Sequence, residues 1–328
     1  MTGLRWGILG LGGIANAFTK DLVANGMIVA AVGSRSLEKA RAFAAAHEVE
    51  AAFGSYQDLA DAPDVDAVDI ATPHPFHAEA AALAIKSGKH VLIEKPITLN
   101  THEAAYLMNL GEQHNVTVMG AMWTRFLPHM VRIRQILADE AIGEIRAVFA
   151  AHTKVTTDDP AHRLNNIELG GGALLDLGVY PVSFVHEVLG DPTTIMSTGR
   201  FRETVADAEV SAHFRFANGA SALVITASDA AGPNTASIHG KKGYVEIEGT
   251  WCAPSAFKVF DSNKVLIEDF PRVQINGRGM HLQAQEFEKL VAAGKRTGSI
   301  MPIAQSGAIM KTMDTIRKQI GLVYPSDL

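Results

Sequence analysis

Hydrophobic and polar positions follow two different patterns along the chain, and the change comes near residue 121. Before it, short apolar runs alternate with longer Ala-rich segments whose apolar residues recur at helical spacing. The runs predict strands at 4–9, 27–33, 67–72, 90–94 and 116–121, and the segments predict helices at 14–25, 36–47, 75–87 and 99–114. Strands separated by helices of this length indicate βαβ crossovers, and therefore a doubly wound, buried parallel sheet.

After a transitional helix at 128–138 the pattern favours strands. Residues 205–216 alternate strictly, so that small and apolar residues share one face, while Asp207, Glu209, His213 and Arg215 share the other. The dipeptide Asn218-Gly219 predicts a tight type I′ hairpin turn into a return strand at 221–228. Further strands are expected at 235–239, 244–248 and 256–260, and closing helices at 281–293 and 303–320.

The predicted fold is therefore α/β, with two domains. A parallel-sheet domain takes residues 1–121, and an α+β domain with a large, mainly antiparallel sheet takes residues 122–328. One face of the second sheet is expected to be covered by helices. The C-terminal helix is allowed to pack back on the first domain.

Composition narrows the classes of partner. The 29 basic and 35 acidic residues leave a net charge of −6, which argues against a nucleic-acid partner. Cys252 is the only cysteine, so an intramolecular disulfide is excluded and a reducing compartment fits. No stretch approaches the roughly 20 apolar residues of a membrane span. We expect a cytoplasmic protein without a membrane or nucleic-acid partner.

A glycine-rich turn follows the first predicted strand and opens the first helix, with the sequence Gly10-Leu11-Gly12-Gly13-Ile14-Ala15. Gly10 permits the tight turn, and Gly12 lets the backbone approach a pyrophosphate. Gly13 and Ile14 begin the helix, whose N-terminal N–H groups and dipole favour phosphate. This placement predicts a dinucleotide-binding Rossmann domain.

The second strand ends at Gly33-Ser34-Arg35-Ser36, where a fold that selects NAD usually has an acidic residue for the ribose 2′-hydroxyl. Ser34 and Arg35 instead offer a hydroxyl and a guanidinium, which suit a 2′-phosphate. The alternative is that Arg35 is an ordinary surface arginine. The residues favour NADP as the cofactor.

Two further segments lie directly after apolar strands, Thr72-Pro73-His74-Pro75-Phe76-His77 and Glu94-Lys95-Pro96. Both are therefore expected at the carboxyl edge of the parallel sheet, where open α/β folds bind ligands. Because a proline follows, Lys95 is expected in an extended turn at that edge. The alternative is a surface lysine paired with Glu94.

These motifs, together with the segment 170–180 (GGGALLDLGVY), resemble the glucose–fructose oxidoreductase/inositol dehydrogenase (Gfo/Idh/MocA) family. Within it, segments 122–126, 162–164 and 316–321 are similar to the branch of dimeric dihydrodiol dehydrogenase and NADP-dependent D-xylose dehydrogenase. The similarity runs from about residue 4 to residue 325. The order and spacing of the motifs make it specific, whereas any one of them is modest evidence.

The resemblance implies roles for individual residues. Lys95 matches the catalytic lysine of the family, with a cis bond to Pro96, and Tyr180 matches a position that is His or Tyr in different branches. Asp176 is the carboxylate one helical turn earlier. His74 stands where Asn is common, so its cofactor contact departs from the pattern. Cofactor contacts are implied for Thr72, Pro73, His74, His77, Glu94 and Lys95. The resemblance also implies a homodimer formed through the second-domain sheet.

The chemistry of these residues agrees with an oxidoreductase. Asp176 and Tyr180 are four residues apart and would share one face of a helix, which Pro181 would kink. A tyrosine titrates near 10, so as a base it needs a cation such as Lys95 to stabilise its phenolate. Tyr180 would then take the proton of a substrate hydroxyl, with Lys95 on the alkoxide and Asp176 orienting the pair. Whether Lys95 or Tyr180 is the formal base stays open, and a packed aromatic is the alternative for Tyr180.

Trp123 and Arg125 follow the last strand of the first domain, and Arg163 lies further along the chain. An aromatic surface with donors suits a ring that bears adjacent hydroxyls, so a small neutral sugar, polyol or trans-dihydrodiol is the expected substrate. Structural roles are the alternatives for Trp123 and Arg163. His74 and His77 have no third ligand in sequence, and no metal site is expected.

Two other functions remain open within the same resemblance. One is a dinucleotide-binding sensor without turnover, which the presence of both Lys95 and Tyr180 disfavours. The other is an NAD-using glycosidase, which the Ser34-Arg35 segment disfavours. The sequence does not decide which substrate is used or the physiological direction of the reaction.

Overall fold

The computed structural model describes residues 3–327, which form two compact units. The first unit contains the residues up to 123 together with 275–307, and the second contains 124–274 together with the residues from 308 onward. The sequence predicted a division at 121, with residues 122–328 in the second domain and with the C-terminal helix allowed to pack back on the first. The structure instead places 275–307 in the first unit, because this segment packs on the beginning of the chain.

The first unit is built on a six-stranded, fully parallel sheet in the order β3-β2-β1-β4-β5-β6. Its strands are β1 (Arg5–Leu9), β2 (Ile28–Gly33), β3 (Ala51–Phe53), β4 (Ala67–Ile70), β5 (His90–Glu94) and β6 (Val118–Ala121). Its helices are α1 (Gly13–Ala24), α2 (Leu37–His47), α3 (Tyr56–Asp61), α4 (His77–Lys86), α5 (Thr101–His114) and α8 (His281–Ala292). This strand order and helix alternation confirm the predicted doubly wound fold.

Local sequence accounts for the boundaries of this unit. Ser36 and Asn100 accept hydrogen bonds from the N–H groups three residues later, and α2 and α5 begin directly after them. The helix predicted at 75–87 begins as a 3₁₀ turn, His74–Phe76, before α4. β3 and α3 were not predicted, because three and six residues are too few to show a period.

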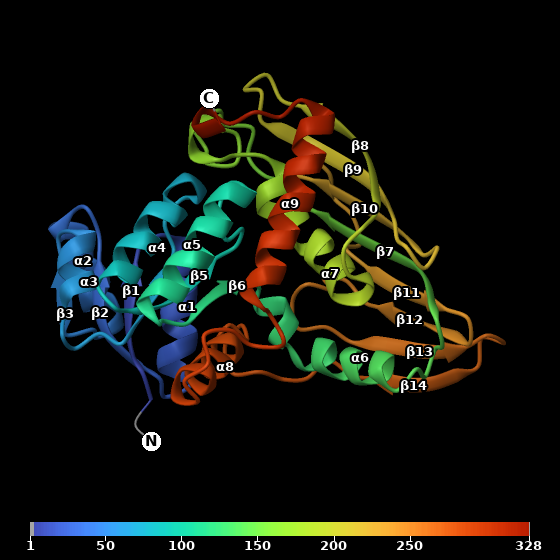
Figure 1. The fold of residues 1–328 in the computed structure, drawn as a ribbon, viewed down its shortest axis with the longest axis horizontal. Coiled ribbons are helices and arrows are strands. Elements are labelled where there is room, and N and C mark those ends of the chain that lie inside the picture. Colours follow the sequence, from blue (N-terminus) through green and yellow to red (C-terminus); the bar gives the residue numbers. More distant parts are fainter. Residues whose placement is uncertain (1–2, 328) are drawn as a thin grey trace. The chain divides into compact units, whose positions relative to one another are not determined.

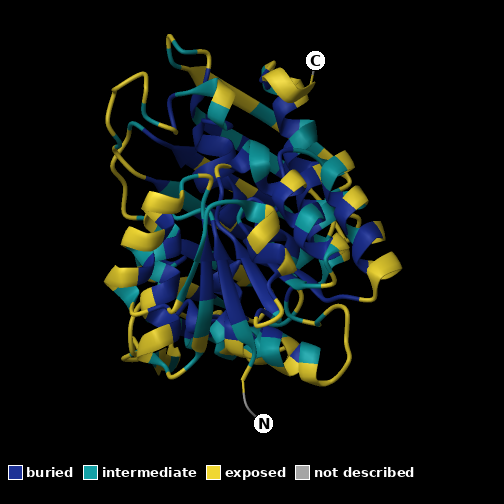
Figure 2. Ribbon diagram, turned by 90° about the vertical axis from the view of Figure 1, so that its left-hand side faces the viewer, coloured by how far each residue is buried: buried dark blue, intermediate teal, exposed yellow. Residues whose placement is uncertain are grey.

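Helix α8 is distant in sequence from the rest of the first unit, and side-chain contacts hold it there. The Trp6 indole N–H donates to Glu288 Oε1 at 3.0 Å, and the Trp6 ring lies 5.4 Å from that of Phe287. Asp21 of α1 accepts from the backbone N–H groups of Arg278 and Met280. Figure 2 shows how the strands form the buried interior while the helices around them carry the exposed residues.

The second unit contains an eight-stranded sheet in the order β14-β13-β12-β11-β7-β10-β9-β8. Its strands are β7 (Ile145–Thr153), β8 (Thr194–Phe201), β9 (Asp207–Arg215), β10 (Ser221–Ala227), β11 (Ala236–Gly240), β12 (Gly243–Ile247), β13 (Phe257–Asp261) and β14 (Leu266–Phe270). Among the described strands of this sheet, only the β7–β10 pair is parallel, so the predicted, mainly antiparallel sheet is confirmed.

Helices cover one face of this sheet. Figure 1 shows α6 (Pro128–Ala138), α7 (Val179–Leu189) and α9 (Ile303–Ile320) on that side, and no labelled helix of this unit lies on the other. Short turns complete the chain: 3₁₀ turns at Trp123–Phe126, Ile167–Leu169 and Pro325–Asp327, and a π turn at Leu174–Gly178. The sheet therefore has one packed and one open face, as its alternating sequence predicted.

The strict alternation predicted for β9 fails at its first residue. Glu209, His213 and Arg215 lie on the open face, but Asp207 is fully buried. The register between β8 and β9 shifts there, with Glu209 opposite Arg200 and Asp207 opposite Phe201. Such a bulge inserts an extra residue and reorients the side chains beside it, so Asp207 turns inward.

The hairpin between β9 and β10 also differs from the prediction. Gly219 has φ +80°, whereas Asn218 is not among the residues with positive φ, and a type I′ turn needs positive φ at both. The Gly219 N–H donates to the Phe216 carbonyl, and the Phe216 N–H donates to the Ala220 carbonyl. These bonds define a three-residue loop that ends in a left-handed glycine, so the type I′ assignment was wrong.

One run in the second unit, Ile167–Leu189, has the length and composition of a membrane-spanning helix. The hydrophobic pattern of the sequence predicts no such stretch. In the structure 83% of its most apolar window is buried inside the protein, which is the environment of a core helix in a globular unit.

Candidate active site

The glycine-rich turn between β1 and α1 packs against the backbone at Gly10 and is open at Gly12 and Gly13. Gly10 has φ +93°, and a Cβ there would lie 2.6 Å from the backbone nitrogen of Thr72. At Gly12 and Gly13 a Cβ would have no other atom within 4 Å, and both residues are exposed. No side chain caps α1, so the N–H groups of its first turn, including that of Ile14, face this space.

The end of β2 places Ser34 and Arg35 beside this turn, since β1 and β2 are paired. Ser34 Oγ accepts from the Ser36 N–H at 3.3 Å, which shapes the bend before α2. Arg35 is exposed, and its guanidinium carbon lies 5.5 Å from the centre of the Phe76 ring. A guanidinium over an aromatic face is an attractive arrangement that holds Arg35 at the sheet edge.

The segment after β4 was predicted to contact the cofactor, and its residues differ in exposure and in hydrogen bonding. Thr72 Oγ1 is buried and has no hydrogen-bond partner among residues 3–327. Pro73 is exposed, and His74 is buried within the 3₁₀ turn. These three residues follow the strand next to β1, so they lie at the same carboxyl edge as the glycine turn.

His77 does not have the position expected of a cofactor contact. Its side chain is 1% exposed, and its ring nitrogens lie 2.8 Å from the carbonyl oxygens of Thr72 and Pro96. Burial lowers the pKa of the imidazole, although the two carbonyls raise it. His77 therefore connects the turn after β4 to the turn after β5, and we do not retain it as a direct cofactor ligand.

The turn after β5 carries Glu94, Lys95 and Pro96. The Lys95–Pro96 bond is cis, which confirms the isomer implied by the resemblance. Glu94 is buried, Lys95 is half-buried, and the Lys95 N–H donates to Glu94 Oε2 at 3.2 Å. On β4, the buried carboxyl of Asp69 is on the same face as Glu94, because Asp69 pairs with Leu92. Burial and the Glu94 charge raise the pKa of Asp69 well above its ordinary value.

Trp123 closes the first unit's main segment and is 8% exposed. The guanidinium of Arg278 lies 6.0 Å from its ring centre, within the same unit. Arg278 is itself exposed, and its backbone is fixed by Asp21. The aromatic platform predicted at Trp123 thus has a cation on its face, and no motif in the sequence indicates that contact.

Arg125 faces the interior of the second unit. Its side chain is 2% exposed; Nε donates to Ser183 Oγ at 3.0 Å and Nη2 to the Ser183 carbonyl at 2.8 Å. Glu187 lies 3.8 Å away, and burial lowers the pKa of Arg125 against that charge. Because its donors are used on α7, we do not retain Arg125 as a substrate contact.

Asp176 and Tyr180 lie on one continuous helical run but not on one regular helix. Asp176 belongs to the π turn, whereas Tyr180 belongs to α7. A π turn changes the rotation per residue, so a four-residue spacing across the junction does not by itself put both side chains on one face. The irregularity precedes Pro181, where the kink had been expected. Both side chains are almost fully buried.

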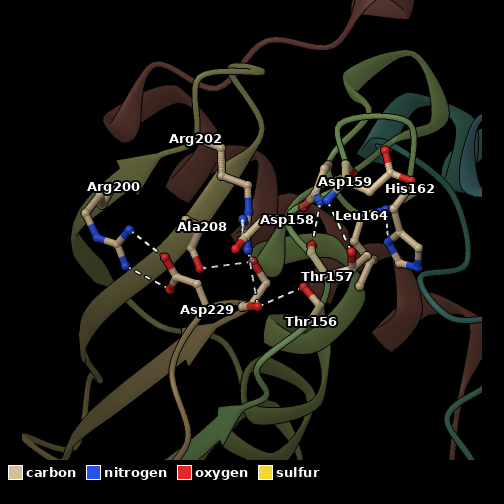
Figure 3. Close-up of polar contacts among 12 residues, drawn as sticks. Thr156, Thr157, Asp158, Asp159, His162, Leu164, Arg200, Arg202, Ala208 and Asp229 are labelled. Atoms are coloured by element: carbon tan, nitrogen blue, oxygen red, sulfur yellow. Dashed lines mark hydrogen bonds and ion pairs between the residues drawn. The ribbon is translucent and has the colours of Figure 1, made fainter.

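Arg163 reaches Asp176 from the preceding loop. Its Nη2 lies 3.1 Å from Asp176 Oδ1, while about half of the Arg163 side chain remains exposed. The loop, residues 154–166, is itself anchored: Thr156 donates to the Ser228 carbonyl, and Arg202 pairs with Asp158 at 2.8 Å. Figure 3 shows these anchors and the Arg200–Asp229 pair beside them. The Arg163–Asp176 pair therefore places a positive charge beside the buried Asp176 carboxylate.

Two residues near Tyr180 were missed. The His152 ring lies edge-on to Tyr180 with 5.0 Å between the ring centres, and its Nδ1 is 3.2 Å from the Leu177 carbonyl. That contact requires a proton on Nδ1. The Cys252 sulfur lies 3.7 Å from Nε2 and 4.0 Å from Nδ1 of the same ring. His152 is on β7, which the sequence analysis had not delimited, and no motif marks either residue.

The structure thus gathers the sequence-predicted residues in two places. At the carboxyl edge of the parallel sheet are the glycine turn, Ser34-Arg35, the Thr72 segment and Glu94-Lys95. In the second unit, Arg163, Asp176 and Tyr180 lie with His152 near the helical run.

The chain is similar to characterised oxidoreductases over nearly its whole length. Residues 4–122 match the GFO/IDH/MocA oxidoreductase family with its NAD-binding Rossmann fold, and residues 130–246 match the C-terminal domain model of that family. The trans-1,2-dihydrobenzene-1,2-diol dehydrogenase of Xenopus laevis is 34% identical over 98% of this chain and 99% of that protein. The protein of the same name from Mus musculus is 34% identical over 99% of each chain.

Solved structures show the same fold at lower identity. A 3-ketoreductase from Actinomadura kijaniata, solved with NADP and TDP-benzene, has a TM-score of 0.85, 24% identity and 97% coverage of this chain and 98% of its own. An aldose-aldose oxidoreductase from Caulobacter crescentus, complexed with glycerol, has a TM-score of 0.86, 21% identity and 97% coverage of both. The family match covers both halves of the chain, in the order that the motifs predicted. The chain belongs to the GFO/IDH/MocA family of oxidoreductases.

Proposed function

We propose that the protein is an NADP-dependent dehydrogenase or reductase that acts on a CH–OH or C=O carbon of a small neutral ring compound. The observation that carries the proposal is the cofactor edge of the first unit. There, an open glycine turn lies beside an exposed arginine, with no acidic residue at the end of β2. The full-length similarity to dihydrodiol dehydrogenases supports the reaction class.

The residues at this edge fit a dinucleotide with a 2′-phosphate. The space at Gly12 and the uncapped start of α1 suit a pyrophosphate, which the helix N-terminus attracts. Arg35 and Ser34 suit the 2′-phosphate, and the buried Thr72 hydroxyl offers a hydrogen-bonding group with no internal partner in the described part of the chain. We propose Gly10, Gly13, Ile14, Pro73, His74 and Glu94 as the remaining parts of this cofactor site.

NADP, when bound, supplies the hydride acceptor or donor. The chain's own residues then manage the proton on the substrate oxygen. We propose that Tyr180 Oη exchanges that proton and that Lys95 Nζ, as a cation, stabilises the phenolate or alkoxide. Asp176 is proposed to orient these groups, with Arg163 fixing its carboxylate through the 3.1 Å pair.

For the substrate we propose a trans-dihydrodiol or a cyclic aldose. The relatives of about one-third identity are named for a dihydrodiol of benzene, and a structural neighbour is named for aldoses. Trp123, with Arg278 on its ring, and Tyr180 supply aromatic surface, and Arg163 supplies a donor. Such a mixture suits a neutral ring with adjacent hydroxyls.

We further propose a homodimer formed through the open face of the eight-stranded sheet. Four apolar residues on β7, β8 and β10, beside polar residues such as His213 on β9, are 39–54% exposed: Phe149, Met196, Leu223 and Ile225. An exposed apolar patch with a polar surround is typical of a self-complementary two-fold interface. The proposed roles of the units are cofactor binding for the first, which also contributes Trp123 as a substrate contact, and substrate binding and assembly for the second. A cytoplasmic location fits the single buried cysteine.

Two other functions are tested by the same experiment. A cofactor-binding sensor would bind NADP without turnover, and a glycosidase would release sugar without net NADPH. Purified protein is mixed with NADP and, separately, a trans-dihydrodiol, D-xylose, D-glucose or myo-inositol, and absorbance is followed at 340 nm. We expect NADPH formation with at least one donor; its absence with all of them, despite NADP binding, refutes the proposed function.

Variants of the active protein then test the residues. Lys95→Ala and Tyr180→Phe are each expected to lower kcat by roughly 10²–10⁴, the usual contribution of acid–base groups, while NADP binding largely survives. The exposed Tyr106→Phe is the matched control and should behave as wild type. Arg35→Asp should reverse the preference for NADP over NAD, whereas Arg41→Asp on the exposed side of α2 should not. Equal affinity of the wild type for both cofactors would contradict the NADP assignment.

A further inference from the structure

A buried carboxylate lies at the start of the helical run that carries Asp176 and Tyr180. Asp207 is 0% exposed, and its Oδ2 accepts from the Leu174 N–H, the first of the π turn, at 2.6 Å. The first N–H groups of a helix have no partner inside it, so a carboxylate there fixes where the helix begins. Gly172, with φ +127°, approaches so closely that a Cβ would overlap Asp207 Oδ1. Only glycine at position 172 therefore leaves room for the Asp207 carboxylate beside this turn.

The C-terminal tail reaches the same turn. Tyr324 is 1% exposed, and its hydroxyl donates to the Gly171 carbonyl at 2.8 Å. The tail is held in turn by Asp327, which accepts from the Tyr324 N–H at 2.8 Å and from Arg317 of α9 at 2.9 Å. Figure 1 shows the C-terminal end lying beside the green loop that precedes this turn. Asp207 and Tyr324, which are more than a hundred positions apart in sequence, thus both hydrogen-bond to the same glycine-containing turn.

We propose that Asp207 and Tyr324 form a latch that positions the helical run, so that the C-terminal tail sets how well Asp176 and Tyr180 are placed for turnover. Both are positioning residues, because they contact the turn and not the reacting groups. The proposal rests on the proposed function for its effect on kcat. Its structural part, that the latch orders residues 172–180, stands independently of any activity.

The electrostatics of the latch make it sensitive to pH near neutrality. Burial raises the pKa of Asp207 to about 6, although its backbone N–H partners and the Arg317 charge lower it. Burial and the Asp207 charge raise the pKa of Tyr324 well above its ordinary value, so its hydroxyl remains a donor. Arg317 of α9 and Tyr324 of the tail are the charged or titratable groups that act on Asp207. As pH falls through about 6, Asp207 becomes neutral and its bond to the turn weakens.

The test uses Asp207→Asn and Tyr324→Phe in the full-length protein, with the exposed Tyr106→Phe as the matched control. Hydrogen exchange followed by mass spectrometry reports the order of residues 172–180, and β1 serves as an internal reference. NADP affinity and kcat as a function of pH are measured on the same samples. Tyr324→Phe removes one hydroxyl and keeps the ring, so it remains informative if Asp207→Asn folds poorly.

We expect faster exchange at 172–180 in both variants, unchanged exchange in β1 and unchanged NADP affinity. A misplacement of about 1 Å can lower a rate by roughly a hundredfold, so a fall in kcat of tenfold or more is expected. Asp207→Asn should also remove a decline of kcat below pH 6. If both variants exchange at the wild-type rate, the latch is refuted, whether or not any substrate is turned over. If no substrate is turned over, that result refutes the proposed function but not the latch. Faster exchange with wild-type kcat overturns the positioning role.

Discussion

Replacing glycines of the β1–α1 turn by alanine should separate folding from cofactor binding. At Gly10 the φ of +93° strains any other residue by about 1–2 kcal/mol. The added Cβ would lie 2.6 Å from Thr72 N and 2.7 Å from Ala71 C, and backbone atoms of a buried strand end cannot move aside easily. Such overpacking costs a further 1–3 kcal/mol or so. Gly10→Ala should therefore destabilise the protein by about 2–5 kcal/mol.

The same change at Gly12 should leave the fold intact. Gly12 has φ −93°, which alanine adopts readily, and no other atom lies within 4 Å of its Cβ position. The methyl group instead occupies the space through which a pyrophosphate would approach the N–H groups of α1. We expect NADP affinity to fall roughly tenfold to a hundredfold, or about 1.4–2.8 kcal/mol.

Thermal unfolding without cofactor and fluorescence titration with NADP distinguish the two. At about 2–4 °C per kcal/mol, Gly10→Ala should lower Tm by roughly 4–20 °C, and Gly12→Ala should not lower it. Gly88→Ala is the control, because Gly88 has φ +76° with no atom within 4 Å, so it isolates the backbone strain. If Gly12→Ala destabilises as much as Gly10→Ala, or binds NADP as the wild type does, the interpretation of this turn is refuted.

Three further predictions concern single side chains. The pKa of Asp69 is higher in the folded than in the unfolded state, so the stability of the protein falls as the pH rises from about 4 through the folded-state pKa. Asp69→Asn should therefore raise Tm at pH 7 by a few degrees and remove this pH dependence of stability. An unchanged melting curve would contradict this prediction. Arg163→Met should lower kcat about tenfold by freeing Asp176 from the 3.1 Å pair, whereas Arg146→Met, which breaks an exposed pair with Glu144, should not. Leu223→Lys, in the middle of β10 on the open face, should dissociate the proposed dimer in sedimentation experiments, and a wild-type monomer at micromolar concentration would contradict the dimer itself.

Long periodic segments were predictable from the sequence, whereas short ones were not. The helices at 128–138 and 303–320 and the strand at 90–94 have the bounds expected from their patterns. Each has enough residues, or a sharp enough flank, for its period to be unambiguous. β3, with three residues, is specified by pairing with β2 rather than by its own sequence. The return of α8 to the first unit depends on contacts such as Trp6 with Glu288, which no local pattern encodes.

The cofactor edge was predictable for a different reason. Gly10, Arg35 and Lys95 each follow a strand of a parallel sheet, and the carboxyl ends of such strands lie at one edge. Topology therefore brings together residues that are distant in sequence, once the strands are identified. In the second unit this rule does not apply, because most of its strands alternate in direction. His152 and Asp207 were accordingly missed or placed on the wrong face.

Residue type alone also failed to distinguish ligand-facing groups from internal ones. Arg125, His77 and Asp207 all have side chains suited to binding a ligand, and each is buried against a protein partner that is distant in sequence: Ser183, Pro96 and Leu174, respectively. A buried donor or acceptor without a partner costs free energy, so most groups that a fold buries are given a partner within the protein. Arg35 and Arg163 differ because much of each side chain remains exposed beside the predicted site. An arginine of this chain is therefore a candidate for binding a ligand when its side chain is exposed at the edge of the site, and not because of its chemical type alone. The sequence does not show which arginines are exposed in this way.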